Sequence, residues 1–150
     1  MGPDVSYSLR QAADGTVSVL GVEAVERYAA QLEGTTEVGT LLGSDLVGRS
    51  FTPMFDFFAD RTDAFRILGA DFVDASEGTG VVHMAPGFGE DDQTTCEAAG
   101  IPIGQVVPVD GLGRFTDQVG PWAGLNVFDA NPEIIRHLKE EGRVVRHDTY

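Results

Sequence analysis

The sequence holds a single cysteine, Cys96, and only three histidines in 150 residues. One thiol excludes an internal disulfide and any zinc site built on several thiolates. The histidines His83, His137 and His147 are too scattered to form a cluster with metal-ligand spacing. We therefore expect no metal site, and a reducing compartment such as the cytoplasm fits the cysteine usage.

Basic residues are scarce as well. Ten Lys and Arg stand against 24 Asp and Glu, which leaves a formal net charge of −14. That is the wrong sign for a domain that holds a nucleic-acid backbone by itself, because phosphate binding relies on Lys and Arg displacing counterions. The acidic residues either form a solvated surface, or the domain touches only the last nucleotide of a nucleic acid that a larger protein holds.

Long apolar runs are also absent. No stretch of eighteen apolar residues occurs, so we expect no membrane span, and the N-terminus lacks the basic and apolar regions of a secretory signal. Apolar residues at 42% and charged residues at 23% are typical of a globular protein. The length predicts one domain over residues 1–150.

Several catalytic motifs are missing too. The sequence has neither a G-x-S-x-G elbow nor a phosphate-binding G-x-x-x-x-G-K-[ST] loop. Gly87-Phe88-Gly89 has no third glycine at the spacing of a dinucleotide fingerprint. We therefore expect no covalent catalysis by a protein nucleophile and no cofactor bound to this domain.

Periodicity and turn signals predict many short strands with a few helices between them. Val5, Tyr7 and Leu9 alternate with polar residues before the turn signal Asp14-Gly15, which predicts a hairpin over 5–20. The pattern predicts further strands over 65–73, 81–85 and 103–109 and one that starts at 144, with an irregular segment over 35–64. It predicts helices over 22–33 and 90–99. A last helix is expected to be capped by Asn131, with Pro132 at its first position and Gly142 after its end. The fold class expected is mainly β with α (α+β): a closed or strongly curved β-barrel decorated by about three helices.

Four phenylalanines lie close together in the segment expected to be irregular. No basic residues are interleaved among them, so we interpret them as core packing rather than as a stacking platform for nucleic-acid bases. They are Phe51, Phe55, Phe57 and Phe58.

The stretch from Gly78 to Asp92 is the best candidate for a site. A strand that ends near Ala85 and a turn into the next helix would bring His83 and Asp92 together at one mouth. A carboxylate at a helix start is held ionised by the helix dipole, which suits an ammonium group. Spacing alone favours a simpler interpretation, with His83 a satisfied histidine in the sheet and Asp92 one more helix-start acid beside Glu90 and Asp91.

The same stretch closely resembles the central motif of the editing insertion of isoleucyl-tRNA synthetases, the domain called connective polypeptide one. The resemblance extends in order along nearly the whole chain, through residues 46–55, 108–110, 113–116, 128–139 and 146–150. His83 favours the isoleucyl type, because valyl enzymes tend to carry Lys there and leucyl enzymes Met.

This resemblance implies hydrolysis of the ester of valyl-tRNA made by mistake on isoleucine tRNA, the double-sieve editing for which this enzyme family is the standard example. It implies that Asp92 binds the α-ammonium of the valine and that His83 excludes isoleucine and orients the substrate. The Gly78-Thr79-Gly80 backbone would line the pocket, and a bound water would be the nucleophile. The implied partners are the 3′ end of aminoacylated tRNA(Ile), the misattached valine and the rest of the synthetase, whose synthetic domain uses ATP.

The family's editing pocket also uses a threonine-rich strand that normally lies just before the equivalent of Gly2-Pro3-Asp4. The 150 residues do not include that strand. We therefore expect that the chain folds but hydrolyses valyl-tRNA poorly. Two alternatives stay open at this point: a non-catalytic acidic module that binds an amino acid or a protein, and an editing domain for valine or leucine tRNA, which His83 disfavours.

Overall fold

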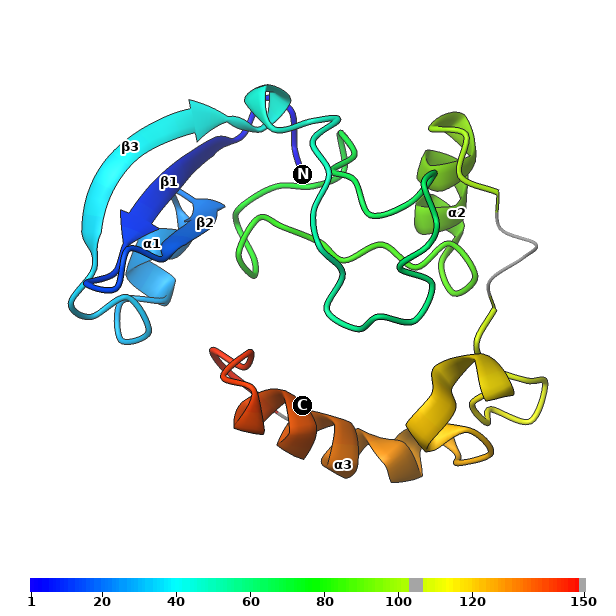
Figure 1. Cartoon of the computed structure of the whole chain (residues 1–150). Coiled ribbons are helices and arrows are strands. Elements are labelled where there is room, and N and C mark those ends of the chain that lie inside the picture. Colours follow the sequence, from blue (N-terminus) through cyan, green and yellow to red (C-terminus); the bar gives the residue numbers. More distant parts are fainter. Residues whose placement is uncertain (103–106, 149–150) are drawn as a thin grey trace.

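The computed structural model describes residues 1–102 and 107–148. Within them the order of elements is β1 (Ser6–Gln11), β2 (Val17–Gly21), α1 (Ala24–Arg27), β3 (Thr36–Leu42), the 3₁₀ segment η1 (Gly43–Asp45), α2 (Glu90–Ala98), the 3₁₀ segment η2 (Asp117–Trp122) and α3 (Val127–Glu140). In Figure 1 the sheet with α1 lies on one side of the molecule, α2 on the other, and the irregular green segment runs between them.

The predicted hairpin is confirmed. β1 and β2 pair antiparallel from Tyr7 opposite Gly21 to Gln11 opposite Val17. The connecting turn is closed because the Thr16 N–H donates to the Asp14 carboxylate at 2.9 Å, and Gly15 adopts φ +89°, which glycine does without strain.

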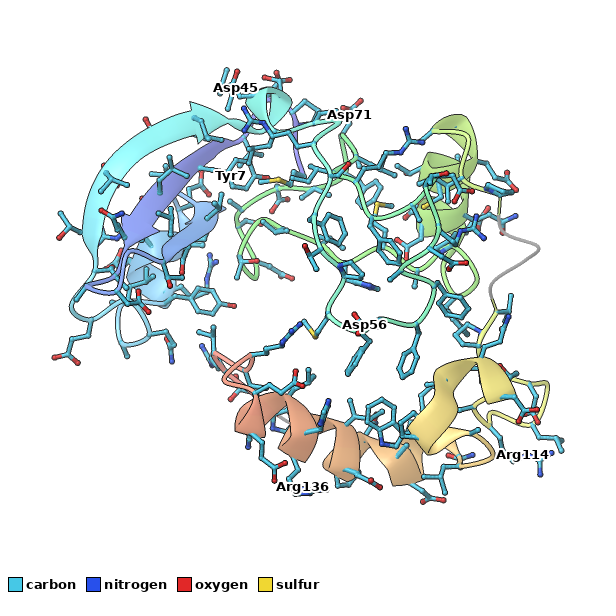
Figure 2. The ribbon with its side chains drawn as sticks, viewed as in Figure 1. Tyr7, Asp45, Asp56, Asp71, Arg114 and Arg136 are labelled. Carbon is cyan, nitrogen blue, oxygen red and sulfur yellow. The ribbon has the colours of Figure 1, made fainter. Side chains whose placement is uncertain are left out.

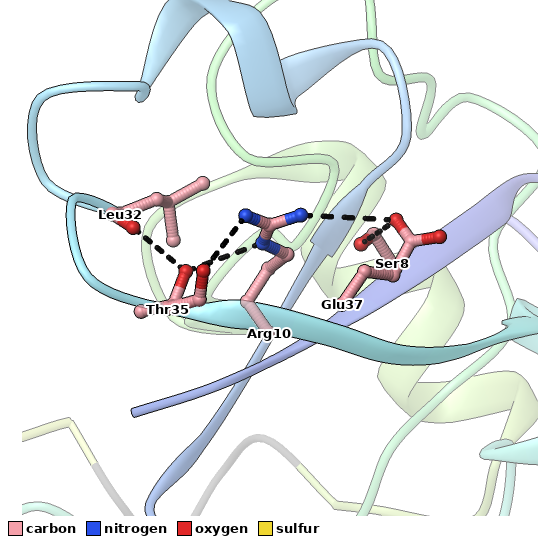
Figure 3. A network of polar contacts seen from close by, with 5 residues as sticks. All are labelled: Ser8, Arg10, Leu32, Thr35 and Glu37. Atoms are coloured by element: carbon pink, nitrogen blue, oxygen red, sulfur yellow. Dashed lines mark hydrogen bonds and ion pairs between the residues drawn. The ribbon is translucent and has the colours of Figure 1, made fainter. Parts of the chain in front are cut away.

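A third strand, β3, pairs with the other edge of β1. It lies within residues 35–64, for which the sequence predicts an irregular segment. Its pairing shifts register between Leu9 and Arg10, the signature of a β-bulge. Side chains connect the two strands beside this irregularity: the buried Ser8 hydroxyl donates to Glu37 at 2.8 Å, and Arg10 Nε donates to the Thr35 hydroxyl at 3.2 Å (Figure 3). These polar contacts stabilise one register of β3 over its neighbours.

The predicted barrel is wrong. The described residues form an open three-stranded antiparallel sheet of order β2-β1-β3, accompanied by three α-helices and two 3₁₀ segments. Closing a barrel requires both edge strands to find partners. Here the free edge of β2 is met only by a loop, through Gly21 N–H to Thr79 O at 2.8 Å, and β3 pairs with β1 alone among the described strands.

The strands predicted over 65–73 and 81–85 do not form. The first contributes one isolated bridge, Ser50 to Arg66, and the second contributes none. The backbone of 81–85 is bonded locally instead, because Val81 N–H donates to Thr79 Oγ1 and Ala85 N–H donates to Asp92. The strand predicted from 144 is absent over 144–148, and that over 103–109 lies partly outside the described residues, with only a bridge at Val109.

The helices agree with the sequence in part. α2 confirms the helix predicted over 90–99, whereas α1 covers only four residues of the helix predicted over 22–33 before the chain continues in turns. α3 begins earlier than predicted: Asn126 is its cap, accepting the Phe128 N–H at 3.0 Å, and Pro132 lies inside. Ala130, in the turn before Pro132, is fully buried, and this packing stabilises the early start.

Two small clusters hold part of the buried apolar side chains, and others, such as Tyr7, Val73 and Cys96, are buried outside them. Leu20, Ala24 and Leu32 pack together beside the sheet. A second cluster joins η2 to α3 and is covered by aromatic rings from the irregular segment; it comprises Val119, Trp122 and Ala130 with Phe55, Phe57, Phe115 and Ile134. The interpretation of the phenylalanines as packing is therefore confirmed for Phe55 and Phe57, whereas Phe51 is 49% exposed and contacts Phe65 edge to face.

Candidate functional site

The candidate motif, together with the three residues before it, contains two parts that are held very differently. We call residues 75–80 the anchored loop and residues 81–89 the open segment. The anchored loop lies against the hairpin and α1, and the open segment leads from it to the start of α2 (Figure 1).

Arg27, the last residue of α1, binds the anchored loop through its backbone carbonyls. Its guanidinium donates to Ala75 O at 3.3 and 3.4 Å, to Ser76 O at 2.6 Å and to Gly78 O at 2.6 Å. The planar fork of an arginine has enough donors to reach several acceptors at once, which a lysine ammonium does less well.

The hairpin binds the other end of the anchored loop. The Tyr7 hydroxyl donates to Gly80 O at 2.7 Å and accepts the N–H of Gly2 at 3.1 Å, and Figure 2 shows Tyr7 between the sheet and the green segment. Tyr7 is fully buried, and this burial raises the pKa of its hydroxyl above the ordinary value of about 10, with the Gly2 hydrogen bond opposing. Together with the bond from Gly21 to Thr79, five carbonyls of the loop are occupied.

The start of the anchored loop is fixed by a local turn. Asp74 accepts the Ser76 N–H at 2.8 Å and the Ser76 hydroxyl at 2.6 Å. These bonds, the hydroxyl first, lower the pKa of the Asp74 carboxyl, because they stabilise its charged form. The carboxylate therefore directs the chain into the turn at ordinary pH.

Asp92 lies in the first turn of α2, after the cap residue Gly89 and beside the acids Glu90 and Asp91. One of its oxygens accepts the Ala85 N–H at 2.9 Å, so the carboxylate is bound to the chain two residues after His83. Its charge also reaches Cys96, whose thiol pKa is raised by burial and, in second place, by Asp92. Asp92 is partly buried, and its second oxygen accepts no hydrogen bond from the residues described.

His83 lies on the open segment, and its side chain is exposed. His83 lies two residues before Ala85, whose N–H binds Asp92. Because each Cα–Cα step spans about 3.8 Å, the two residues must lie close together. The structure thus brings the Asp92 carboxylate beside the segment that carries His83, but no hydrogen bond or ion pair joins the two side chains, or either of them to Gly78-Thr79-Gly80, among residues 1–102 and 107–148.

A cavity of about 340 Å³ lies elsewhere, between residues 54–57, η2 and α3. Its wall includes Phe55, Trp122 and His137, and Figure 2 places Asp56 on the loop that faces α3. This cavity contains none of the residues of the motif, so we assign the candidate site by its chemistry and not by the depth of a pocket.

Two residues of the site were not indicated by the sequence. Tyr7 was expected on a strand, but the partner of its hydroxyl lies 73 residues further along the chain. Arg27 was expected only as part of the helix over 22–33, and its guanidinium binds carbonyls 48 to 51 residues away. A spacing pattern carries no signal for either bond.

Within the described parts of the chain, no three His, Cys, Asp or Glu side chains are grouped as a metal site, and no helix is long and apolar enough to cross a membrane. The expected absence of a cofactor stays a prediction.

No family model matches the sequence. Known proteins do. The chain is 49% identical over 148 residues to the isoleucine–tRNA ligase of Nocardia farcinica, covering 98% of this chain and 14% of that protein. It is 43% identical over 152 residues to the isoleucine–tRNA ligase of Rickettsia bellii, covering 100% of this chain and 13% of that protein, and 45% identical over 158 residues to that of Corynebacterium efficiens, covering 99% and 15%.

A solved structure, "The crystal structure of GlLeuRS-CP1", superposes on this chain with a TM-score of 0.72 at 15% identity, covering 100% of this chain and 77% of that one. At that identity the likeness concerns the fold alone. Nearly all of the chain takes part in these matches, and it spans about 14% of the length of the curated relatives it matches. The chain therefore has the fold of a connective polypeptide one domain. By its sequence it belongs to the isoleucine–tRNA ligase family.

Proposed function

We propose that this domain edits mischarged tRNA by hydrolysing the ester of valyl-tRNA(Ile). The observation that supports this most is the 49% identity to an isoleucine–tRNA ligase over 98% of the chain, which includes the whole motif from Gly78 to Asp92. A match along the whole chain also favours editing over a non-catalytic binding module. A cytoplasmic location, where tRNA is charged, goes with this proposal.

The proposed reaction needs no protein nucleophile. A water molecule forms a bond from its oxygen to the ester carbonyl carbon, the bond from that carbon to the ribose oxygen breaks, and the ribose oxygen takes a proton. The products are valine and the free 3′ end of the tRNA. The domain then acts by positioning the ester beside the water.

Asp92 is the proposed binding group for the α-ammonium of the valine. One carboxylate oxygen is occupied by Ala85 N–H, so the second is available for the substrate in the described structure. An ammonium bound there fixes the amino end of the ester.

His83 is the proposed residue that excludes isoleucine. Its exposed side chain is accessible to a substrate held at Asp92, and the carboxylate is bound two residues along the chain. A second site that is too small for one extra methylene destroys the product that the synthetic site cannot reject. The Gly78-Thr79-Gly80 backbone completes the proposed site. The rest of the synthetase would bind the tRNA beyond its 3′ end.

The test compares deacylation of valyl-tRNA(Ile) with that of isoleucyl-tRNA(Ile) by the protein in its full natural length. We expect the valyl ester to be hydrolysed and the isoleucyl ester to be spared. Asp92→Asn should lower the rate on the valyl ester about tenfold to a hundredfold, since a hydrogen bond to a charged group contributes roughly 1.5–3 kcal/mol.

The matched control is Asp91→Asn, which removes the same charge from the same helix turn, at an exposed neighbour. It should leave the rate nearly unchanged. The proposal fails if the wild-type protein does not deacylate valyl-tRNA(Ile), or if the two substitutions lower the rate equally.

A further inference from the structure

The anchored loop is bound through its carbonyls, and this determines where its N–H groups point. All described peptide bonds are trans, and in a trans peptide unit the C=O of one residue and the N–H of the next point in opposite directions. The Gly78 carbonyl is directed at Arg27, so the Thr79 N–H points away from α1. The Thr79 carbonyl is directed at Gly21, so the Gly80 N–H points away from the hairpin.

The next peptide unit follows the same rule but differs in outcome. The Gly80 carbonyl is directed at Tyr7, so the Val81 N–H also points away, and it donates to Thr79 Oγ1 at 3.3 Å. The N–H groups of Thr79 and Gly80 find no acceptor in the described part of the chain. Two donors on consecutive residues are therefore without a partner, one facing away from α1 and one away from the hairpin.

A buried or half-buried N–H without an acceptor is costly, and native proteins rarely leave one unless a ligand or water completes it. Gly80 is buried and Thr79 is half-buried. Two unpartnered backbone donors on consecutive residues are suited to an oxygen acceptor that carries negative charge, such as the carbonyl or ribose oxygen of an ester.

We propose that Arg27 and Tyr7 are positioning residues, which hold the anchored loop so that the Thr79 and Gly80 N–H groups donate to an oxygen acceptor of the substrate. The inference rests on the proposed function for the identity of that substrate. It assigns a role to two residues that act through the loop backbone.

The geometry argues against an accidental contact. Six hydrogen bonds connect the hairpin and α1 to the loop: four from Arg27, one from Gly21 and one from Tyr7. All six end on carbonyl oxygens. A guanidinium has donors only, so its four bonds occupy carbonyls and leave the N–H groups of the loop free.

The first experiment measures loop order without any substrate. Backbone ¹⁵N order parameters of Thr79 and Gly80 are recorded by NMR for the 150-residue chain. They should fall from about 0.85 in the wild type to below about 0.6 in Arg27→Ala, with partial recovery in Arg27→Lys, because the ammonium restores the charge but not the fork. Arg49→Ala is the matched control, since Arg49 is an exposed arginine that donates to a single carbonyl away from the loop, Asp45 O at 3.2 Å.

The second experiment measures deacylation of valyl-tRNA(Ile) by the protein in its full natural length. Arg27→Ala and Tyr7→Phe should lower kcat about tenfold or more with a smaller change in KM, because small misplacements of positioning groups are costly in the transition state. Ser8→Ala is the control for Tyr7→Phe: it removes a buried hydroxyl from the same strand, but one that donates to Glu37 and not to the loop.

The two experiments separate the two ideas. Absence of deacylation in the wild type overturns the proposed function, and the order parameters then decide the positioning role by themselves. Order parameters that stay the same in Arg27→Ala overturn the positioning role. The positioning role is also overturned if the wild type deacylates valyl-tRNA(Ile) and Arg27→Ala has the same kcat.

Discussion

The candidate motif from Gly78 to Asp92 begins inside the anchored loop, residues 75–80, and continues through the open segment, residues 81–89. These two regions are stabilised in opposite ways. The anchored loop is bound by six hydrogen bonds from the hairpin and α1. The open segment has no strand partner among the described residues and exposes Val81, Val82 and His83. Hydrogen bonds tie it to Thr79 at its start and to Asp92 at Ala85. Its free energy of local opening must therefore be much smaller.

This difference fits the division of labour that we propose. Backbone N–H donors act only if their direction is fixed, so the loop that carries them needs many bonds. A residue that discriminates between two side chains must instead be accessible, as the exposed His83 is. The comparison predicts that substitutions in the anchored loop change global stability more than substitutions in the open segment.

The largest effect is expected at Gly80. Its φ of +75° is unfavourable for other residues, and a Cβ there would lie 3.3 Å from Ala75 Cβ and 3.4 Å from Tyr7 Cε1. We expect Gly80→Ala to lower the free energy of unfolding by about 2–4 kcal/mol, from the left-handed backbone and from overpacking. Urea unfolding followed by circular dichroism measures this loss.

Gly78→Ala is the matched comparison within the same loop. Gly78 has φ +57°, but a Cβ there would meet no atom within 4 Å. Only the backbone cost of about 1 kcal/mol should remain. Equal losses for the two variants would show that close packing of the loop on Tyr7 contributes nothing.

The next effect concerns Tyr7 and pH. The folded pKa of its hydroxyl is raised, so its contribution to stability is complete below the unfolded pKa of about 10 and is lost as pH rises through the folded value. At neutral pH, Tyr7→Phe should lower stability by about 1–3 kcal/mol, because Gly80 O and Gly2 N–H lose their buried partner.

Unfolding curves between pH 8 and about 11 check the sign. The wild type should lose stability above about pH 10 more steeply than Tyr7→Phe, and Ser8→Ala should keep the wild-type slope. Identical slopes in wild type and Tyr7→Phe would contradict a buried, donating hydroxyl.

A smaller effect is expected at Asp92. Asp92→Ala removes the acceptor of Ala85 N–H and should cost about 1 kcal/mol, whereas Asp92→Asn keeps an acceptor oxygen and should recover most of that loss in urea unfolding. Stability and deacylation should therefore separate in the Asn variant, which is stable but slow. If Asn restores both, the carboxylate is structural and the ammonium-binding role is wrong.

How much of this could be predicted from sequence depends on how local each feature is. The turn at Asp14-Gly15, the start of α2 among three acids and the glycine after α3 all rest on residues within a few positions, and these predictions are confirmed. β3 was missed because Gly39 interrupts its apolar pattern and its pairing with β1 crosses an irregularity at Leu9 and Arg10.

Competing local signals account for the other errors. Asn126 and Asn131 are both acceptable helix caps, and the burial of Ala130 decides for the earlier one. The Val81-to-Ala85 run has strand composition, yet a strand needs a partner strand, and here the N–H groups at its two ends bind Thr79 and Asp92 instead. For the site, the sequence indicated the motif residues, whereas the carbonyl contacts of Tyr7 and Arg27 depend on tertiary structure.

The smallest change in stability is expected at His83, where the effect on selectivity should be large. The His83 side chain is exposed and makes no hydrogen bond within the described residues, so His83→Ala should change the free energy of unfolding by no more than about 0.5 kcal/mol. If His83 excludes the larger substrate, the same variant should begin to hydrolyse isoleucyl-tRNA(Ile) while it still hydrolyses the valyl ester. One methylene is worth about 1–3 kcal/mol in such discrimination, so the rate ratio between the two esters should shift about tenfold or more. A ratio that stays unchanged, at unchanged stability, would assign the size limit to another wall of the site and leave the open segment without a role in selectivity.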